Sequence, residues 1–188
     1  MEDADKEVAI DIGGGWGEYF FSLAKENPQK TFIVLDPSIR PIKRAPNNLF
    51  LIKWRTNVDS KLPFLPNKID EAHLNFLFGV IKFDEKHSFG TEESNKRYRA
   101  LLKDLKDVLK PNSSVYLVDV RGNIFRIQQL LKEEGYQIIQ EPKRLKDESR
   151  TAQSNFFTEA LAFKKIDETE EESRILPMEI EARWEGKK

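Results

Sequence analysis

The residues best placed to do chemistry are a run of glycines that follows a short apolar segment. Residues 8–12 are apolar except for Asp11, and Gly13-Gly14-Gly15-Trp16-Gly17 comes directly after them. Glycine adopts positive φ readily, and without a side chain it lets a ligand lie against the backbone. Asp11 adds a carboxylate that can accept hydrogen bonds from a cationic or hydroxyl-bearing ligand. The pattern predicts a binding turn between a strand and a helix.

A second acid stands at a distance that nucleotide-binding proteins use. Asp36 comes 19 residues after Gly17, at the end of the next apolar run. In open α/β sheets an acid at this place binds the hydroxyls of a ribose. The glycine run lacks the Gly-Lys-Ser/Thr of a P-loop, and its spacing differs from the dinucleotide fingerprint. Two alternatives therefore remain for these residues alone, namely a nucleoside site of another type and a purely structural turn.

Strands and helices that alternate along the chain must position this turn. We expect three helices, at residues 18–27, 92–110 and 124–134; the second has apolar residues at steps of three and four. We expect strands at 8–12, 31–35, 49–54, 69–78, 114–120, 136–140 and 155–164. This alternation predicts an α/β fold, a Rossmann-like and mostly parallel sheet with helices on both faces. No helix-length segment precedes the last strand, so the C-terminal strand pair should be antiparallel.

Composition excludes several other kinds of site. The 188 residues carry 31 basic and 32 acidic side chains, so a net charge of −1 gives no general attraction for nucleic acid. The absence of cysteine excludes disulfides, thiolate metal sites and a cysteine nucleophile, and two histidines favour neither a zinc site nor a serine triad. We therefore expect no metal. No apolar run approaches the roughly 20 residues of a membrane helix, so we expect a cytoplasmic protein without membrane contact.

The balance of charge changes near the C-terminus. Residues 166–188 hold eight acids and four bases, a net charge of −4, which leaves +3 for residues 1–165. We expect residues 1–165 to form one domain and residues 166–188 to be an acidic C-terminal extension. The extension is either solvated or, as Ile180 and Trp184 indicate, partly docked on the domain or on a partner subunit.

The glycine turn resembles a motif of a known enzyme family. Asp-x-Gly-x-Gly-x-Gly at residues 11–17 is similar to the first motif of the class I S-adenosylmethionine-dependent methyltransferases, and the resemblance extends over residues 8–164. It implies that S-adenosylmethionine is the cofactor and that Asp36 binds its ribose hydroxyls. It also implies that Asn57 and Val58 contact the adenine, with Asp59 as a competing choice. The residues implied to line the methionine and ribose are Asp11, Gly13, Gly15 and Gly17.

A second resemblance concerns the site of methyl transfer. Residues 48–79, which contain Asn75-Phe76-Leu77-Phe78-Gly79, look like the tRNA guanine-N7 methyltransferases, whose proline and aspartate are replaced here by Leu77 and Phe78. Residues 76–79 are also similar to the Phe-Pro-Trp-Gly of ribosomal RNA adenine-N1 methyltransferases, in which an aromatic residue at the position of Phe78 stacks on the target base. The resemblance implies catalytic roles for Asn75, Phe76 and Phe78. The alternative for both phenylalanines is packing in the core.

Local basic clusters point to the substrate. Residues 37–55 contain five bases and no acid, and Arg40 and Arg44 are the candidates for substrate binding. Phosphate contacts need such clusters. Together with the resemblance, they imply an enzyme that methylates a base nitrogen in tRNA or ribosomal RNA, and we expect it to be a monomer or homodimer. A ring nitrogen already offers a lone pair, so the transfer needs alignment more than a general base. Two other functions remain open, a small-molecule methyltransferase and a non-catalytic cofactor-binding or assembly subunit.

Overall fold

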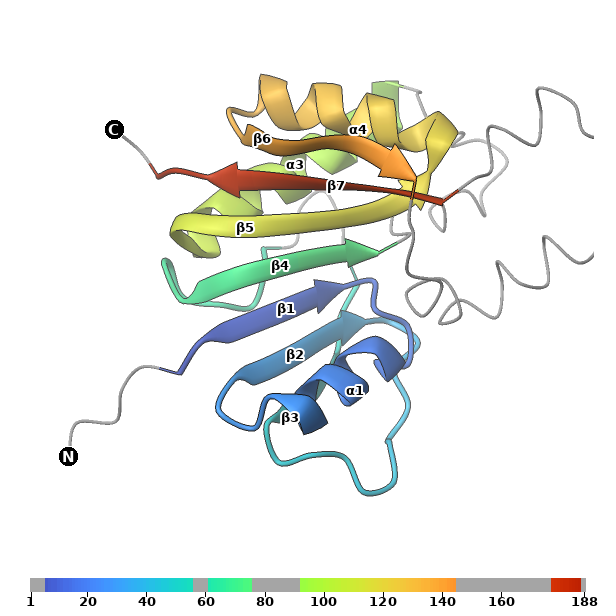
Figure 1. Ribbon diagram of the computed structural model, residues 1–188, viewed down its shortest axis with the longest axis vertical. Coiled ribbons are helices and arrows are strands. Elements are labelled where there is room, and N and C mark those ends of the chain that lie inside the picture. Colours follow the sequence, from blue (N-terminus) through green and yellow to red (C-terminus); the bar gives the residue numbers. More distant parts are fainter. Residues whose placement is uncertain (1–5, 56–60, 76–91, 145–176, 187–188) are drawn as a thin grey trace, which may run out of the picture.

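The computed structural model describes residues 6–55, 61–75, 92–144 and 177–186. Their strands form one sheet of seven in the order β3-β2-β1-β4-β5-β7-β6 (Figure 1). The helices are α1 (Glu18–Glu26), α3 (Glu92–Val108) and α4 (Arg121–Glu133). The strands are β1 (Val8–Ile12), β2 (Thr31–Asp36), β3 (Leu49–Lys53), β4 (Ile69–Asn75), β5 (Leu109–Val120), β6 (Gln137–Arg144) and β7 (Pro177–Trp184).

Five neighbouring strands of the sheet are parallel. β1 pairs with β2 and β4, β2 pairs with β3, and β4 pairs with β5, each in parallel. The carboxyl ends of parallel strands meet at one edge of a sheet, where ligands bind in open α/β folds. That edge, which we call the carboxyl edge, collects the glycine turn after β1, Asp36 at the end of β2 and Asn75 at the end of β4. The predicted fold class is confirmed.

The antiparallel part of the sheet corrects one prediction. β7 lies between β5 and β6 and pairs antiparallel with both, and it comes from residues 177–184, which we had placed in the acidic extension. Ile180 and Ala182 are buried in the core, whereas Glu179 and Glu181 alternate with them. The strand expected at residues 155–164 lies outside the described residues. Acidic residues at every second position are compatible with a strand that has one face toward solvent. Net charge alone therefore does not predict that a segment lies outside the domain.

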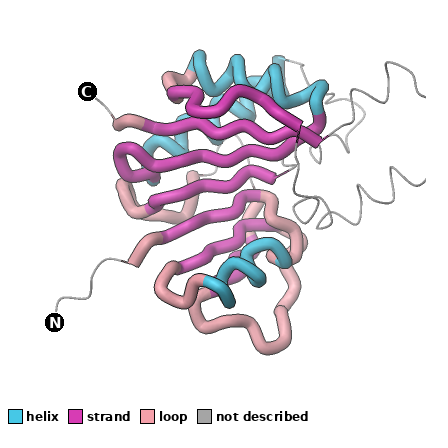
Figure 2. The backbone as a smooth tube through the Cα atoms, viewed as in Figure 1, coloured by secondary structure: helices cyan, strands magenta, loops and turns pink. Residues whose placement is uncertain are grey.

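Helices cover both faces of the sheet, as predicted (Figure 2). α3 and α4 pack on one face, where their leucines join residues of β1, β4, β5 and β7 in the larger core. α1 packs on the opposite face over β1, β2 and β3, through Phe20 and Ala24. Across the part of the chain that the structure describes, no helix is long and apolar enough to span a bilayer.

Candidate functional site

The glycine turn has the backbone conformation that its sequence predicts. Gly13, Gly15 and Gly17 have φ of 77°, 58° and 80°. The Gly13 amide donates a hydrogen bond to the carbonyl of Leu35 at 2.8 Å, and the Gly17 amide donates to that of Gly14 at 2.9 Å. Gly17 then caps α1 in the left-handed conformation. A side chain is strained at positive φ, so the three predicted glycines are needed to turn the chain from β1 into α1.

Among the glycines of the turn, an added Cβ would meet its neighbours most closely at Gly14, a position that the sequence did not single out. A Cβ at Gly14 would lie 2.5 Å from the Oδ2 atom of Asp11 and 2.8 Å from a methyl of Val34. By contrast, a Cβ at Gly15 would have nothing within 4 Å. Asp11 is only 1% exposed, so the turn lies tightly over this carboxylate. Gly15 is therefore required for its φ, and Gly14 for the close approach of the turn to Asp11.

Asp36 joins the ends of β1 and β2. Its Oδ2 atom accepts a hydrogen bond from the Gly15 amide at 3.0 Å, and its Oδ1 atom accepts one from the Ser38 amide at 2.6 Å. Each carboxylate oxygen has two lone pairs, so Asp36 can hold the turn and still accept hydrogen bonds from a ligand. The structure thus brings Asp11, Asp36 and the predicted glycines together at the carboxyl edge.

Asn75 ends β4, the strand beside β1. Its Oδ1 atom is buried and has no hydrogen-bond partner in the part of the chain that the structure describes. A buried acceptor without a partner costs about 1–3 kcal/mol, and a ligand that donates a hydrogen bond removes this cost. The other predicted site residues, Asn57, Val58, Phe76 and Phe78, lie outside the described residues.

Four exposed cations lie on the β2–β3 linker and at the end of β3. We call Arg40, Lys43, Arg44 and Lys53 the linker cations; within the described residues none of them has an ion-pair partner. The guanidinium of Arg40 lies 4.9 Å from the ring centroid of Trp16, so the linker contacts the glycine turn. Arg44 has a φ of 59°, a left-handed conformation that is uncommon for long side chains. Of the two predicted substrate residues, Arg40 therefore contacts the glycine turn at the carboxyl edge, and Arg44 lies further along the same linker.

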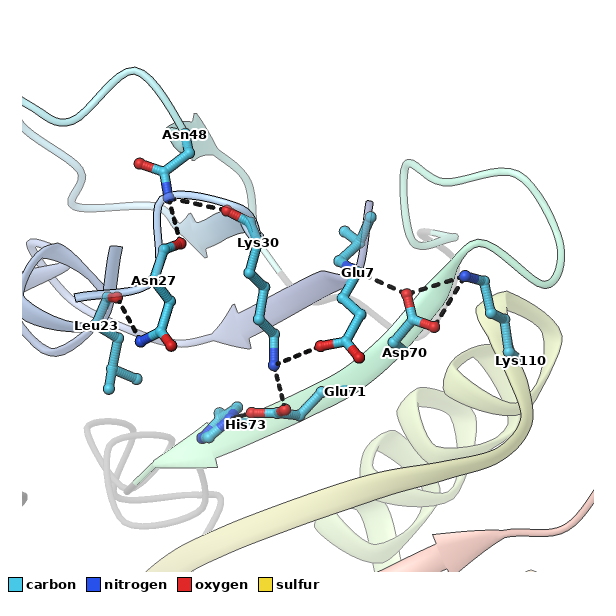
Figure 3. A network of polar contacts seen from close by, with 10 residues as sticks. Glu7, Leu23, Asn27, Lys30, Asn48, Asp70, Glu71, His73 and Lys110 are labelled. Carbon is cyan, nitrogen blue, oxygen red and sulfur yellow. Dashed lines mark hydrogen bonds and ion pairs between the residues drawn. The ribbon is translucent and has the colours of Figure 1, made fainter. Parts of the chain in front are cut away.

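The opposite, amino edge of the sheet carries a dense network of polar contacts (Figure 3). Glu71 of β4 accepts hydrogen bonds from Lys30 at 2.5 Å and from the ring of His73. Burial raises the pKa of Glu71, but the hydrogen bonds and charges of His73 and Lys30 outweigh it and lower the pKa to about 2. Asp70 binds Lys110 at 2.8 Å and the amide of Val8 at 2.9 Å. These charges stabilise the junction of four strands.

Sequence comparison adds independent information. A family model described as a methyltransferase domain matches residues 2–165. A bifunctional methyltransferase of Rickettsia conorii is 28% identical over 149 residues, which are 75% of this chain and 28% of that protein. A tRNA (guanine-N(7)-)-methyltransferase of Lactobacillus johnsonii is 27% identical over 132 residues, 65% of this chain and 57% of that protein. The chain thus spans less than two thirds of the length of either relative.

Structural comparison agrees with the family model. The 16S rRNA (adenine(1408)-N(1))-methyltransferase from Catenulisporales acidiphilia, solved with S-adenosylmethionine, has a TM-score of 0.60 and 14% identity, over 96% of this chain and 87% of that one. At this identity the likeness shows the fold alone. The carboxyl edge, with its glycine turn and two acids, lies where open α/β sheets bind their ligands. The chain belongs to the methyltransferase domain family.

Proposed function

We propose that this methyltransferase transfers the methyl group of S-adenosylmethionine to a ring nitrogen of a base in tRNA or ribosomal RNA. The observation that carries the proposal is the set of linker cations, which have no ion-pair partners among the described residues and of which Arg40 contacts Trp16 of the glycine turn. Polyanionic substrates are attracted by such a surface, and each cation that contacts a phosphate contributes a salt-dependent part of the affinity. A small neutral substrate gains nothing from it.

The residues at the carboxyl edge fit the cofactor. S-adenosylmethionine carries an electrophilic methyl group on a sulfonium, together with a ribose and an adenine. Asp36 has lone pairs left for the ribose hydroxyls, and the absence of a Cβ at Gly14 lets the turn lie closely over Asp11. The two acids, Asp11 and Asp36, also favour a positively charged ligand at this edge.

Asn75 is suited to orient a base. Its buried Oδ1 atom accepts a hydrogen bond from an amino group, which adenine and guanine both have. A ring nitrogen needs no general base because its lone pair is already free, so Asn75 contributes by holding the base in line with the methyl group. Alignment of this kind accounts for about 7–11 kcal/mol of a barrier in well-oriented reactions. Phe76 and Phe78 follow Asn75 directly and are proposed to complete the site around the base.

The relatives support RNA as the substrate class. The relative from Lactobacillus johnsonii is named for methylation of a guanine in tRNA, and the structural neighbour from Catenulisporales acidiphilia for methylation of an adenine in ribosomal RNA. Both modifications place the methyl group on a ring nitrogen. Because this chain spans only part of its curated relatives, the substrate is inferred from the local site rather than transferred from either relative.

Incubation with methyl-labelled S-adenosylmethionine tests this function. The protein is supplied with separate pools of tRNA, ribosomal subunits, proteins and metabolites, and transfer of the label is counted in each. We expect the label in an RNA pool. The Gly14→Val variant serves as the inactive control, since it disturbs the turn over Asp11. Label in the metabolite pool alone would favour a small-molecule methyltransferase, and cofactor binding without transfer to any pool would favour a non-catalytic subunit.

A further inference from the structure

The glycine turn presents a tryptophan to solvent. Trp16 is flanked by Gly15 and Gly17, which have φ of 58° and 80°, and the indole side chain is 45% exposed. Large aromatic side chains contribute most when they are buried, so one held half-exposed on a fixed turn suggests a partner that stacks on it. Other exposed apolar side chains of the described chain, such as Leu65 and Phe125, lie away from this turn on a loop and on α4.

Arg40 fixes the position of this tryptophan. Its guanidinium lies 4.9 Å from the centre of the Trp16 ring, in the arrangement of a cation–π contact. The same residue is one of the linker cations, so the exposed indole lies in direct contact with a positive charge of the β2–β3 linker. Aromatic faces beside a basic groove are the two elements with which proteins bind single-stranded nucleic acids. Positive charges do not distinguish a single strand from a duplex. A stacking face does, because it requires an unstacked base.

We propose that Trp16 and Arg40 form a stacking platform for an unpaired base next to the target base, so that the enzyme selects single-stranded RNA. This inference rests on the proposed function, because it names the form of RNA which that function accepts. The linker cations then contact the phosphates on either side, without reading the base sequence. Bases in a continuous duplex are stacked on each other and do not reach the platform.

Binding of short RNAs tests the platform. The protein is saturated with S-adenosylhomocysteine and titrated with a short oligoadenylate and with an RNA duplex of the same length. We expect the wild type to bind the single strand more tightly, Trp16→Leu to weaken this binding about tenfold, and Trp16→Phe to retain most of it. Phe125→Leu is the matched control, because Phe125 is 50% exposed on α4, and it should bind like the wild type. The dependence on salt should stay unchanged in Trp16→Leu, since no phosphate contact is removed.

Tryptophan fluorescence gives a second readout that a structural role would not move. Stacking of adenine on Trp16 should quench part of the emission of the wild type, and this part should vanish in Trp16→Phe. If the wild type methylates RNA while Trp16→Leu binds oligoadenylate with unchanged affinity, the platform is wrong and the proposed function stands. If Trp16→Leu instead loses affinity for S-adenosylhomocysteine, the tryptophan serves the cofactor and the platform is again wrong. If the wild type binds and methylates no RNA, both inferences fail.

Discussion

The two edges of the same sheet use polar residues in opposite ways. At the amino edge, Glu71 accepts hydrogen bonds from both Lys30 and His73 (Figure 3). Asp70 binds Lys110 and accepts a hydrogen bond from the backbone of β1. At the carboxyl edge, Asn75 has a buried oxygen with no hydrogen bond in the described part of the chain, and the linker cations lack ion pairs there. The polar groups of the amino edge therefore stabilise the sheet, whereas the proposed function assigns the unpartnered groups of the carboxyl edge to a ligand.

The same difference separates two basic regions that look alike in sequence. Residues 37–55 and helix α3 each contain five basic residues. On α3, Arg99 is paired with Glu133 and Glu134, and Lys106 binds Glu134 at 3.3 Å. The linker cations have no such partners within the residues that the structure describes. Whether a cation is paired, rather than how many cations a segment has, therefore indicates which region is free to bind an anion.

The largest effect is expected from crowding the carboxyl edge. Gly14→Val places a branched side chain where even a Cβ would be 2.5 Å from Asp11 Oδ2. The turn must move, and a displacement of about 1 Å at a reacting site can reduce a rate about a hundredfold. We expect methyl transfer to fall by about that factor and the affinity for S-adenosylhomocysteine, measured by calorimetry, to fall with it. Gly15→Ala is strained by its φ of 58° but has nothing within 4 Å of its Cβ, so its loss should be smaller; an equal loss in both variants would contradict the assignment of a close contact to Gly14.

At the amino edge the expected effect is on stability alone. Glu71→Gln removes a carboxylate whose pKa is lowered from 4.5 to about 2, so we expect a loss of about 2 kcal/mol of unfolding free energy at neutral pH. In the wild type this contribution is complete above pH 4.5 and disappears as the pH falls toward 2, because the unfolded chain takes up the proton first. Denaturant unfolding over that pH range measures the difference. A change in cofactor affinity at pH 7 would show that the two edges are not independent.

Neutralising cations in pairs sharpens the comparison of the two basic regions. The double variant Arg40→Gln/Arg44→Gln should weaken RNA binding at every sequence and reduce the slope of log affinity against log salt by about 1.4 to 1.8 units. Arg99→Gln/Lys106→Gln removes the same charge from α3 and should leave the slope unchanged, at a small cost in stability from the lost ion pairs. Equal slopes in the two double variants would remove the distinction between paired and unpaired cations.

The smallest effect concerns Asn75. Asn75→Leu replaces a buried acceptor that has no hydrogen-bond partner among the described residues with an apolar group of similar size, so the unfolding free energy should stay constant or rise by up to about 1 kcal/mol. Methyl transfer should nevertheless fall, because the base loses a hydrogen bond. Thermal unfolding and transfer rates measured on the same preparation check both parts. A destabilised variant would mean that the oxygen has a structural role.

The sequence predicted the parallel part of the fold because each element there is local. β1 and β3 begin where the apolar runs begin, at Val8 and Leu49, and α1 follows the glycine turn directly. β7 was missed although Met178, Ile180, Ala182 and Trp184 alternate with polar residues, a period of two that predicts a strand. The acids between them give the segment a negative net charge, which favours the interpretation as an extension. Only the pairing with β5 and β6 shows that the apolar side of the strand is buried.

For the site, too, the sequence predicted the features that depend on local residue type and spacing, and not those that depend on contacts in space. The positive φ of Gly13, Gly15 and Gly17 and the place of Asp36 follow from residue type and spacing. Gly14 could not be found in this way, because its importance depends on how closely Asp11 and Val34 approach it in space. Ion pairing also depends on the tertiary structure. The residues near Arg99 in the sequence do not predict its pairing with Glu133, which lies in α4, after the intervening strand β5.

Identification of the methylated atom tests the central claim most directly. RNA labelled by the wild-type protein is digested to nucleosides, and the labelled nucleoside is identified by chromatography and mass spectrometry against N7-methylguanosine, N1-methyladenosine and ribose-methylated standards. A site that aligns a base without a general base should place the label on a ring nitrogen of a purine. Label on a ribose oxygen or a base carbon, or no labelled nucleoside from any RNA, would contradict the claim that the carboxyl edge of this sheet methylates a ring nitrogen of an RNA base.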